Sequence, residues 1–168
     1  MMRPASILLP FAVLASVAAL AQSPASVEVR FDNPKRFTDF RIDRWRDPCQ
    51  TEALVKELRT WIEREAPRYL PAGTKLTITV TDVDMAGEFE PLHRSGTLDV
   101  RVVRDIYPSR VNLSFALADE TGKVLKEGER KLVSTILTSG SLRSGGSSPL
   151  GYEKEVLREW LGSEFARM

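Results

Sequence analysis

Four carboxylates lie close together in the middle of the chain, directly after an apolar strand pattern. Within nine consecutive positions the sequence places Asp82, Asp84, Glu88 and Glu90. Clustered carboxylate oxygens are the ligands that Ca²⁺ and Mg²⁺ prefer. Against a calcium-binding helix-loop-helix the spacing fits badly, because Ala86 takes the fifth position and His93 the twelfth, where a bidentate Glu is needed. We therefore predict no metal ligands, and interpret the run as a polar turn whose Asp side chains bond to its own backbone.

A catalytic use of the same carboxylates is the alternative. A divalent-metal-dependent hydrolase would use the acidic loop 82–90 through Asp82, Asp84 and Glu88, with His93 as a further ligand. His93 is the only histidine, and it has no partner at a spacing typical of nucleophilic catalysis. We predict no catalytic residues and no cofactor, and the balance favours a protein that is not an enzyme.

A second group of charges follows in residues 99–110. On a strand, Asp99, Arg101, Val103 and Asp105 share one face, and alternating charges there favour salt bridges across neighbouring strands. The alternative is that Arg101, Arg104 and Arg110 grip an anionic ligand, because the guanidinium fork matches carboxylate and phosphate.

These residues suggest a binding surface. We expect a non-enzymatic binding or interaction module that takes an unknown envelope protein or a small ligand. The candidate surface consists of Asp82, Asp84, Glu88, Glu90, Arg101, Arg104 and Tyr107.

Two helices are predicted to support this surface. The first runs from about Pro48 to Ala66, with Asp47 as N-cap and Gln50 completing a capping box. The second follows a Ser/Gly-rich segment, 139–149, that is expected to be a flexible loop. It begins with Ser148 as cap and Pro149 in the first position, and its apolar side includes Trp160.

The strand patterns predict the rest of the fold. Apolar residues alternate with polar ones in 27–31, 76–81, 98–102, 111–117 and 124–137, and Gly128 is expected to mark a bulge. Two amphipathic helices and a sheet with one aliphatic face can bury each other as two layers. The fold class is therefore α+β: a two-layer sandwich whose mostly antiparallel sheet of four to five strands is covered on one face by two helices. The first strand can join the sheet in parallel through its helical crossover.

The N-terminus predicts export. Arg3 is followed by an uncharged run from Ala5 to Leu20, and the small-x-small triplet that ends at Ala21 predicts cleavage after that residue. Residues 1–21 would then be a signal peptide, and residues 22–168 a single α+β domain in the periplasm without a permanent membrane anchor.

The charge and cysteine content narrow the choice of partner. Without Arg3, the 24 Lys and Arg residues become 23, equal to the 23 Asp and Glu residues. A balanced charge argues against nucleic acid, which requires a surplus of cations. Cys49 is the only cysteine, so it is expected either to be buried at the start of the helix or to pair two chains.

The motifs together resemble a family of exported proteobacterial proteins, the domain of unknown function 3016. The resemblance covers nearly all of the mature chain, and its two most specific runs are Asp82 to Gly87 and Arg104 to Pro108. The other residues that carry it are Val27 to Val29, Phe31, Asn33-Pro34, Phe37 to Asp39, Val80-Thr81, Glu88-Phe89, Arg101 to Val103, and Tyr152 to Lys154 before Trp160. The resemblance implies a shared exported fold and no catalytic residues.

Overall fold

The computed structural model describes residues 23–43, 47–89, 101–104, 106–134 and 148–166. Four strands form the main sheet: β1 (Ser26–Phe31), β2 (Lys75–Asp84), β5 (Arg110–Ala118) and β6 (Val124–Val133). Two strands of two residues form a second sheet, β3 (Glu88–Phe89) and β4 (Arg101–Val102). The helices are α1 (Pro48–Glu65) and α2 (Gly151–Phe165), with 3₁₀ turns η1 (Pro34–Arg36) and η2 (Ala66–Tyr69).

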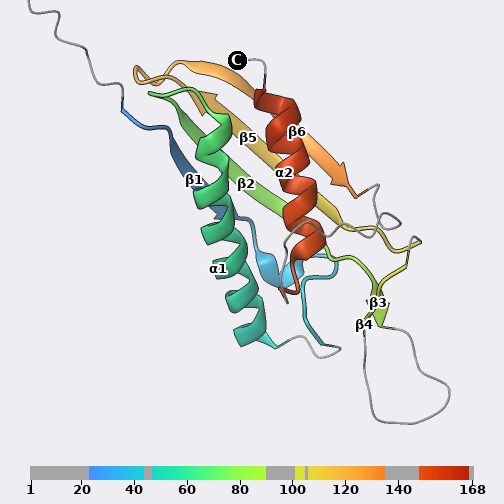
Figure 1. Cartoon of the computed structure of the whole chain (residues 1–168). Helices are drawn as coiled ribbons and strands as arrows, with labels where there is room; N and C mark the ends of the chain where they lie inside the picture. Colours follow the sequence, from blue (N-terminus) through green and yellow to red (C-terminus); the bar gives the residue numbers. More distant parts are fainter. Residues whose placement is uncertain (1–22, 44–46, 90–100, 105, 135–147, 167–168) are drawn as a thin grey trace, which may run out of the picture.

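The main sheet has the order β1-β2-β5-β6 (Figure 1). β1 pairs with β2 in parallel, so that Val29 lies beside Ile78, and α1 provides the crossover between these strands. The β2–β5 and β5–β6 pairs are antiparallel. The mostly antiparallel sheet with a parallel first strand is confirmed.

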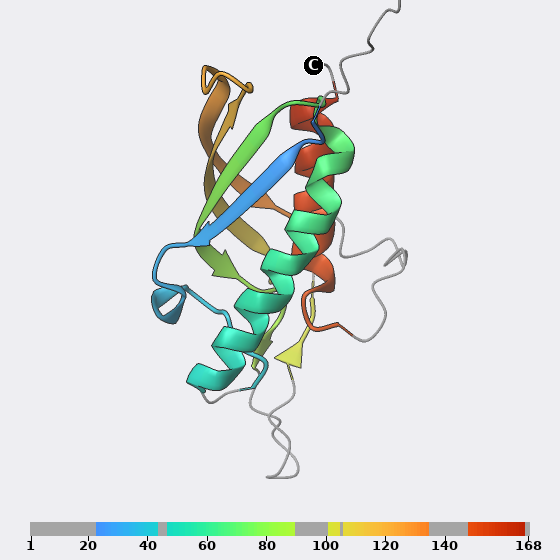
Figure 2. The ribbon, with the colours of Figure 1, turned by 90° about the vertical axis from the view of Figure 1, so that its left-hand side faces the viewer.

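Both helices lie on the same face of the sheet (Figure 2). In β2, the alternating Leu76, Ile78 and Val80 are completely buried beneath them, because every second side chain of a strand points to one face. Leu58 of α1 and Leu157 of α2 meet that aliphatic face and are also completely buried. The fold is an α+β two-layer sandwich, as the patterns predicted.

The start of α1 differs from the prediction in two details. Asp47 caps the helix by accepting the Cys49 N–H at 2.9 Å. Gln50, however, donates its amide to Asp43 at 2.6 Å and forms no capping box, because Asp43 lies within its reach. Of the two alternatives for Cys49, burial is wrong, because the residue is exposed in the first turn of α1.

The start of α2 also differs. The helix begins at Gly151, and the hydroxyl of Ser148 is drawn into a contact between the two helices. Ser148 Oγ donates to Glu57 Oε1 at 2.6 Å, and Lys154 Nζ donates to both oxygens, at 2.8 and 2.6 Å respectively. Ser148 Oγ also accepts the Leu150 N–H at 3.2 Å, so the hydroxyl joins the two helices and still binds a backbone donor just before α2.

Two strand predictions need correction. The described part of 98–102, Arg101–Val102, pairs with Glu88–Phe89 outside the main sheet. Gly128 pairs regularly with Phe115, and the bulge in β6 lies at Leu125, where the register shifts between Leu117 and Ala118 of β5. A Cβ at position 128 would approach the guanidinium of Arg130 to 2.8 Å, so the glycine makes room for that side chain. Residues 98–100, 135–137 and most of the predicted loop 139–149 lie outside the described residues.

Candidate functional site

The acidic run that begins at Asp82 and the segment that contains Arg101 and Arg104 meet at one end of the sandwich. Both helices begin at this end, and β3 and β4 lie there (Figure 1). Arg101 of β4 is the central residue, with a side chain only 13% exposed. Its Nη1 donates to the carbonyl of Gly87 at 2.8 Å, and more weakly to the two preceding carbonyls. Its Nη2 donates to Asp39 Oδ2 at 2.8 Å and to the carbonyl of Arg41 at 3.1 Å. Arg101 therefore joins three segments that are distant in sequence.

The turn after β2 is shaped to receive this guanidinium. Gly87 has φ of 85°, and its N–H donates to the carbonyl of Tyr107 at 3.0 Å. A Cβ at this position would lie 2.8 Å from the carbonyl oxygen of Val102. The glycine is required both by the left-handed backbone and by the close approach of β4.

Glu153, near the start of α2, binds the backbone of the turn after β2. Its side chain is completely buried, and Oε1 accepts the Ala86 N–H at 3.0 Å. Burial raises the pKa of Glu153, and the Ala86 N–H and the charge of Arg101 counteract this rise only in part. The buried hydroxyl of Ser109 also favours the carboxylate, although no hydrogen bond of normal geometry joins the two groups.

Asp82 and Asp84 do not form the predicted polar turn, since both belong to β2. Asp82 accepts from the backbone N–H and the hydroxyl of Thr38, at 2.7 and 2.8 Å. Asp84 pairs with Arg110 at 2.9 Å, and these two residues are direct partners across β2 and β5. Burial raises the pKa of Asp84, the negative charges of Asp39 and Asp82 raise it further, and Arg110 lowers it.

The acidic residues that the hydrolase alternative would use point to separate partners. Glu88 accepts the N–H of Phe89, while Asp82 and Asp84 are bonded to Thr38 and Arg110. Among the described residues, no three His, Cys, Asp or Glu side chains are grouped where a metal ion could be held. Glu90 and His93 lie outside the described residues.

Of the three arginines, Arg101 and Arg110 form ion pairs that the structure describes, and only the pair of Arg110 lies across two strands of the main sheet. Arg110 forms a cross-strand pair with Asp84, and Arg101 is buried against Asp39. Arg104 accepts the N–H of Tyr107 through its carbonyl and has a further contact of its own. Asp99 and Asp105 lie outside the described residues.

A small pocket opens beside Arg101, and we call it the end pocket. Its volume is about 260 Å³, and apolar side chains dominate its lining, which includes Ile42, Met85, Val103, Pro149 and Tyr152. Of these lining residues, Ile42 is 47% exposed and Val103 is 41% exposed. Large apolar side chains thus remain in contact with water around this pocket.

Sequence reasoning missed Asp39 and Glu153 as site residues. Asp39 forms ion pairs with both Arg41 and Arg101, at 2.8 Å each. Glu153 precedes Val156, Leu157 and Trp160 at helical spacing, so a carboxylate stands on the apolar stripe of α2. That position was a usable signal, because an unpaired carboxylate is rarely placed on a buried face.

The protein is a small α+β sandwich in which Arg101 and Glu153 bind the turn at Ala86 and Gly87 beside the end pocket. The chain belongs to the family described as Protein of unknown function (DUF3016), whose model matches residues 25–163. No functionally curated protein matches the chain.

Among solved structures, the chain is similar to one from Caulobacter crescentus CB15 described as a "putative lipoprotein", with 12% identity and a TM-score of 0.38. The match covers 83% of this chain and 85% of that one. A TM-score this low places no constraint on the fold or function of the chain. Neither described helix has the length and apolar character needed to cross a bilayer.

Proposed function

We propose that this chain is an exported, non-enzymatic binding module, and that a partner protein of the cell envelope docks on the end pocket. One observation carries the proposal: exposed Ile42 and Val103 line a pocket whose Arg101 and Ala86 are held by hydrogen bonds to Gly87 and Glu153. Apolar side chains grouped around a recess are typical of an interaction site.

The size of the end pocket favours a side chain as its occupant. A volume of about 260 Å³ is below the roughly 300–1,000 Å³ of sites that enclose a small molecule. One large apolar side chain of a partner fits such a recess, and buried anchors of this kind supply much of the affinity of protein interfaces. Of the residues in the predicted surface, Arg101 lines the pocket. Arg104 and Tyr107 follow the lining residue Val103 in the sequence. Asp82, Asp84, Glu88 and Glu90 remain candidates for a polar rim.

A matched pair of variants tests the site. Val103→Asp places a charge at the pocket, and Leu125→Asp places the same charge on a side chain of similar exposure, 41% against 44%, in β6. Tagged protein would be incubated with envelope extracts after circular dichroism has confirmed that both variants are folded. We expect partners recovered with the original protein to be lost with Val103→Asp and kept with Leu125→Asp. Equal recovery with both variants would exclude the end pocket as the docking site.

Export is tested separately. The charge of Arg3, the apolar run 5–20 and the triplet ending at Ala21 support removal of residues 1–21 and residence in the periplasm. Intact-mass measurement of protein from the periplasmic fraction is expected to give the mass of residues 22–168. Recovery of a chain that still carries Met1, in the cytosol or in washed membranes, would contradict this proposal.

A further inference from the structure

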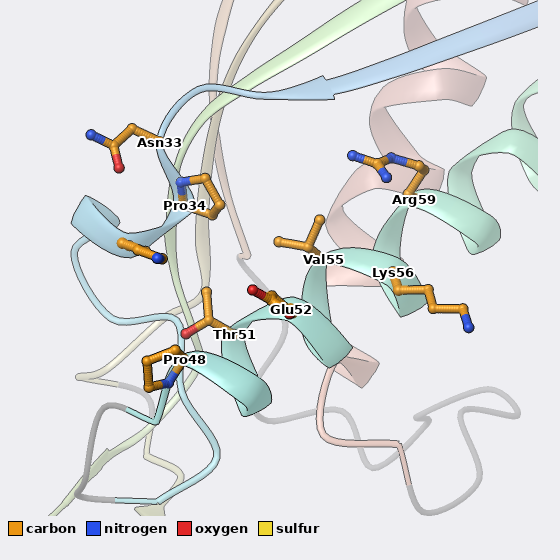
Figure 3. Close-up of a pocket in the computed structure, with 9 residues that line it drawn as sticks. Asn33, Pro34, Pro48, Thr51, Glu52, Val55, Lys56 and Arg59 are labelled. Carbon is orange, nitrogen blue, oxygen red and sulfur yellow. The ribbon is translucent and has the colours of Figure 1, made fainter.

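A second cavity lies on another part of the molecule, between η1 and the side of α1 that faces it (Figure 3). Its volume is about 530 Å³, within the range of small-molecule sites. We call it the α1 groove. It shares no lining residue with the end pocket, so the two sites can be tested independently.

Arg59 is the unusual residue of this groove. Five arginines of the described residues are half-buried, and four of them, Arg41, Arg101, Arg130 and Arg158, form ion pairs with carboxylates. Arg59 differs from these four in having no carboxylate partner among the described residues, while its Nε, like that of Arg101, is buried without a hydrogen bond. The guanidinium instead lies 5.5 Å from the ring centroid of Phe31. Burial of the Nε–H without a replacement partner is unfavourable, so this atom requires an explanation.

The geometry of the groove makes Arg59 available to a ligand. Figure 3 shows the guanidinium directed from α1 toward the side of the groove where Asn33 and Pro34 lie. Stacking on Phe31 limits the conformations of the side chain, so less entropy is lost when an anion binds. A planar guanidinium suits a carboxylate or a phosphate, which it can contact through two parallel hydrogen bonds.

The remaining lining residues indicate what else the ligand contains. Lys35, Lys56 and Arg59 carry positive charge at the groove, against one negative charge on Glu52. Val55, Pro34 and Pro48 provide an apolar wall. The wall and the charges together suit a molecule with an apolar body and one anionic end.

We propose that the α1 groove binds a small organic anion, with its carboxylate or phosphate group on Arg59 and its apolar body against Val55, Pro34 and Pro48. This binding site is additional to the docking of a protein partner at the end pocket. A probe with a carboxylate and a probe with a phosphate distinguish which of the two groups Arg59 prefers.

The direct test uses nuclear magnetic resonance of the unaltered mature protein. Hexanoate and hexyl phosphate are titrated at pH 7 and low salt, and the Arg59 Nε–Hε signal is followed. We expect a saturable shift of this signal with at least one of the two probes, and the tighter one identifies the anionic group. Hexylamine, which has the same apolar chain and the opposite charge, is expected to produce no saturable shift. Acetate and inorganic phosphate are expected to bind about tenfold or more weakly, because they have no apolar body to bury.

Variants provide the second test, with calorimetric titration as the readout. Arg59→Gln is expected to weaken binding of the preferred probe about tenfold or more, the loss typical of a charge-assisted hydrogen bond. Arg64→Gln removes an exposed positive charge from the same helix and is expected to change the affinity less than about twofold, because exposed charges are screened. The absence of a saturable Arg59 shift with either anion, equal binding of hexylamine, or equal effects of the two substitutions would each overturn the proposal. The titration of the unaltered protein keeps the test valid if Arg59→Gln fails to fold.

Discussion

Two glutamates of α2 show at the residue scale how surroundings decide what a carboxyl group does. Glu164 accepts from Arg130 and from Lys126, at 2.8 Å each, and these contacts lower its pKa to about 2. Glu153 is completely buried next to the end pocket, and burial raises its pKa. The same residue type therefore has opposite effects on the pH dependence of stability.

Glu164→Gln is expected to destabilise the protein at neutral pH. Because the folded pKa is about 2 against an ordinary 4.5, the stabilisation is complete above pH 4.5 and is lost as the pH falls toward 2. Lys126 and Arg130 are 35% and 37% exposed, which reduces the effect to about 2 kcal/mol. Urea unfolding at pH 7 and pH 3 is expected to show a difference from the original protein that shrinks with acidification. Glu159→Gln, on the exposed side of α2, is the control and is expected to change little at either pH.

Glu153→Gln is expected to stabilise the protein at alkaline pH, in contrast to Glu164→Gln. A raised folded pKa means that the folded state binds the proton more tightly, so stability falls as the pH rises from 4.5 through the folded pKa. Glutamine keeps a carbonyl for the Ala86 N–H and cannot ionise. Thermal unfolding is expected to show Glu153→Gln above the original protein at pH 8, with the two melting temperatures converging near pH 4. A variant that melts lower at pH 8 would show that the charge of Arg101 favours the ionised carboxylate more than burial opposes it.

Glu153→Ala separates the hydrogen bond from the charge. This variant removes the acceptor and leaves the Ala86 N–H buried without a partner, at a cost of about 1–3 kcal/mol. We expect it to be destabilised at both pH values.

At the scale of elements, the turn between β2 and β3 controls how the two motifs meet. Met85 donates its N–H to the carbonyl of Asp39, and Gly87 donates to the carbonyl of Tyr107. Arg101 binds the carbonyls on the other side of this turn. The turn therefore depends on three segments, and its shape is sensitive to one added atom at Gly87.

Gly87→Ala is expected to destabilise the protein by about 2–4 kcal/mol, from left-handed strain and from crowding of the Val102 carbonyl. Gly122→Ala is the matched control, because its φ of 84° is nearly the same while no atom lies within 4 Å of the added Cβ. Strain alone predicts about 1–2 kcal/mol for that variant. Denaturant unfolding of both measures the difference, and equal losses would show that β4 does not press against the turn.

At the scale of the whole molecule, the described residues of both helices and the main sheet share one apolar core. Phe115 of β5 packs edge-on against Trp160 and Phe165 of α2, with ring centroids 5.4 and 5.7 Å apart. Contacts of this kind couple the layers, so we expect them to unfold together.

Leu157→Ala is expected to cost about 2–5 kcal/mol, because it leaves a cavity where a completely buried side chain joins α2 to the sheet. Leu125→Ala, at a side chain 44% exposed, is expected to cost less than about 0.5 kcal/mol. Far-ultraviolet circular dichroism and tryptophan fluorescence are expected to report the same midpoint in each case. Two separate midpoints for Leu157→Ala would indicate that α2 detaches before the sheet unfolds.

The sequence by itself determined the elements and their layers. Alternation in 76–81 and 111–117, and helical spacing in 48–66, were sufficient because each pattern is a property of consecutive residues that share one face. The prediction that Trp160 lies on the apolar side of the second helix is confirmed for the same reason, since this side chain is 4% exposed.

Only the tertiary structure decided the partners of the charged residues. Asp39 and Arg101 are 62 positions apart, and Ala86 and Glu153 are 67 apart, so no local spacing indicates that they meet. Ser148 also contacts Glu57, 91 positions away, and only packing brings these two side chains together. Arg59 is a similar case, because only the fold shows that no carboxylate of the described residues pairs with it. A side chain of several rotatable bonds selects its partner by proximity, and proximity between distant residues exists only after the layers have packed.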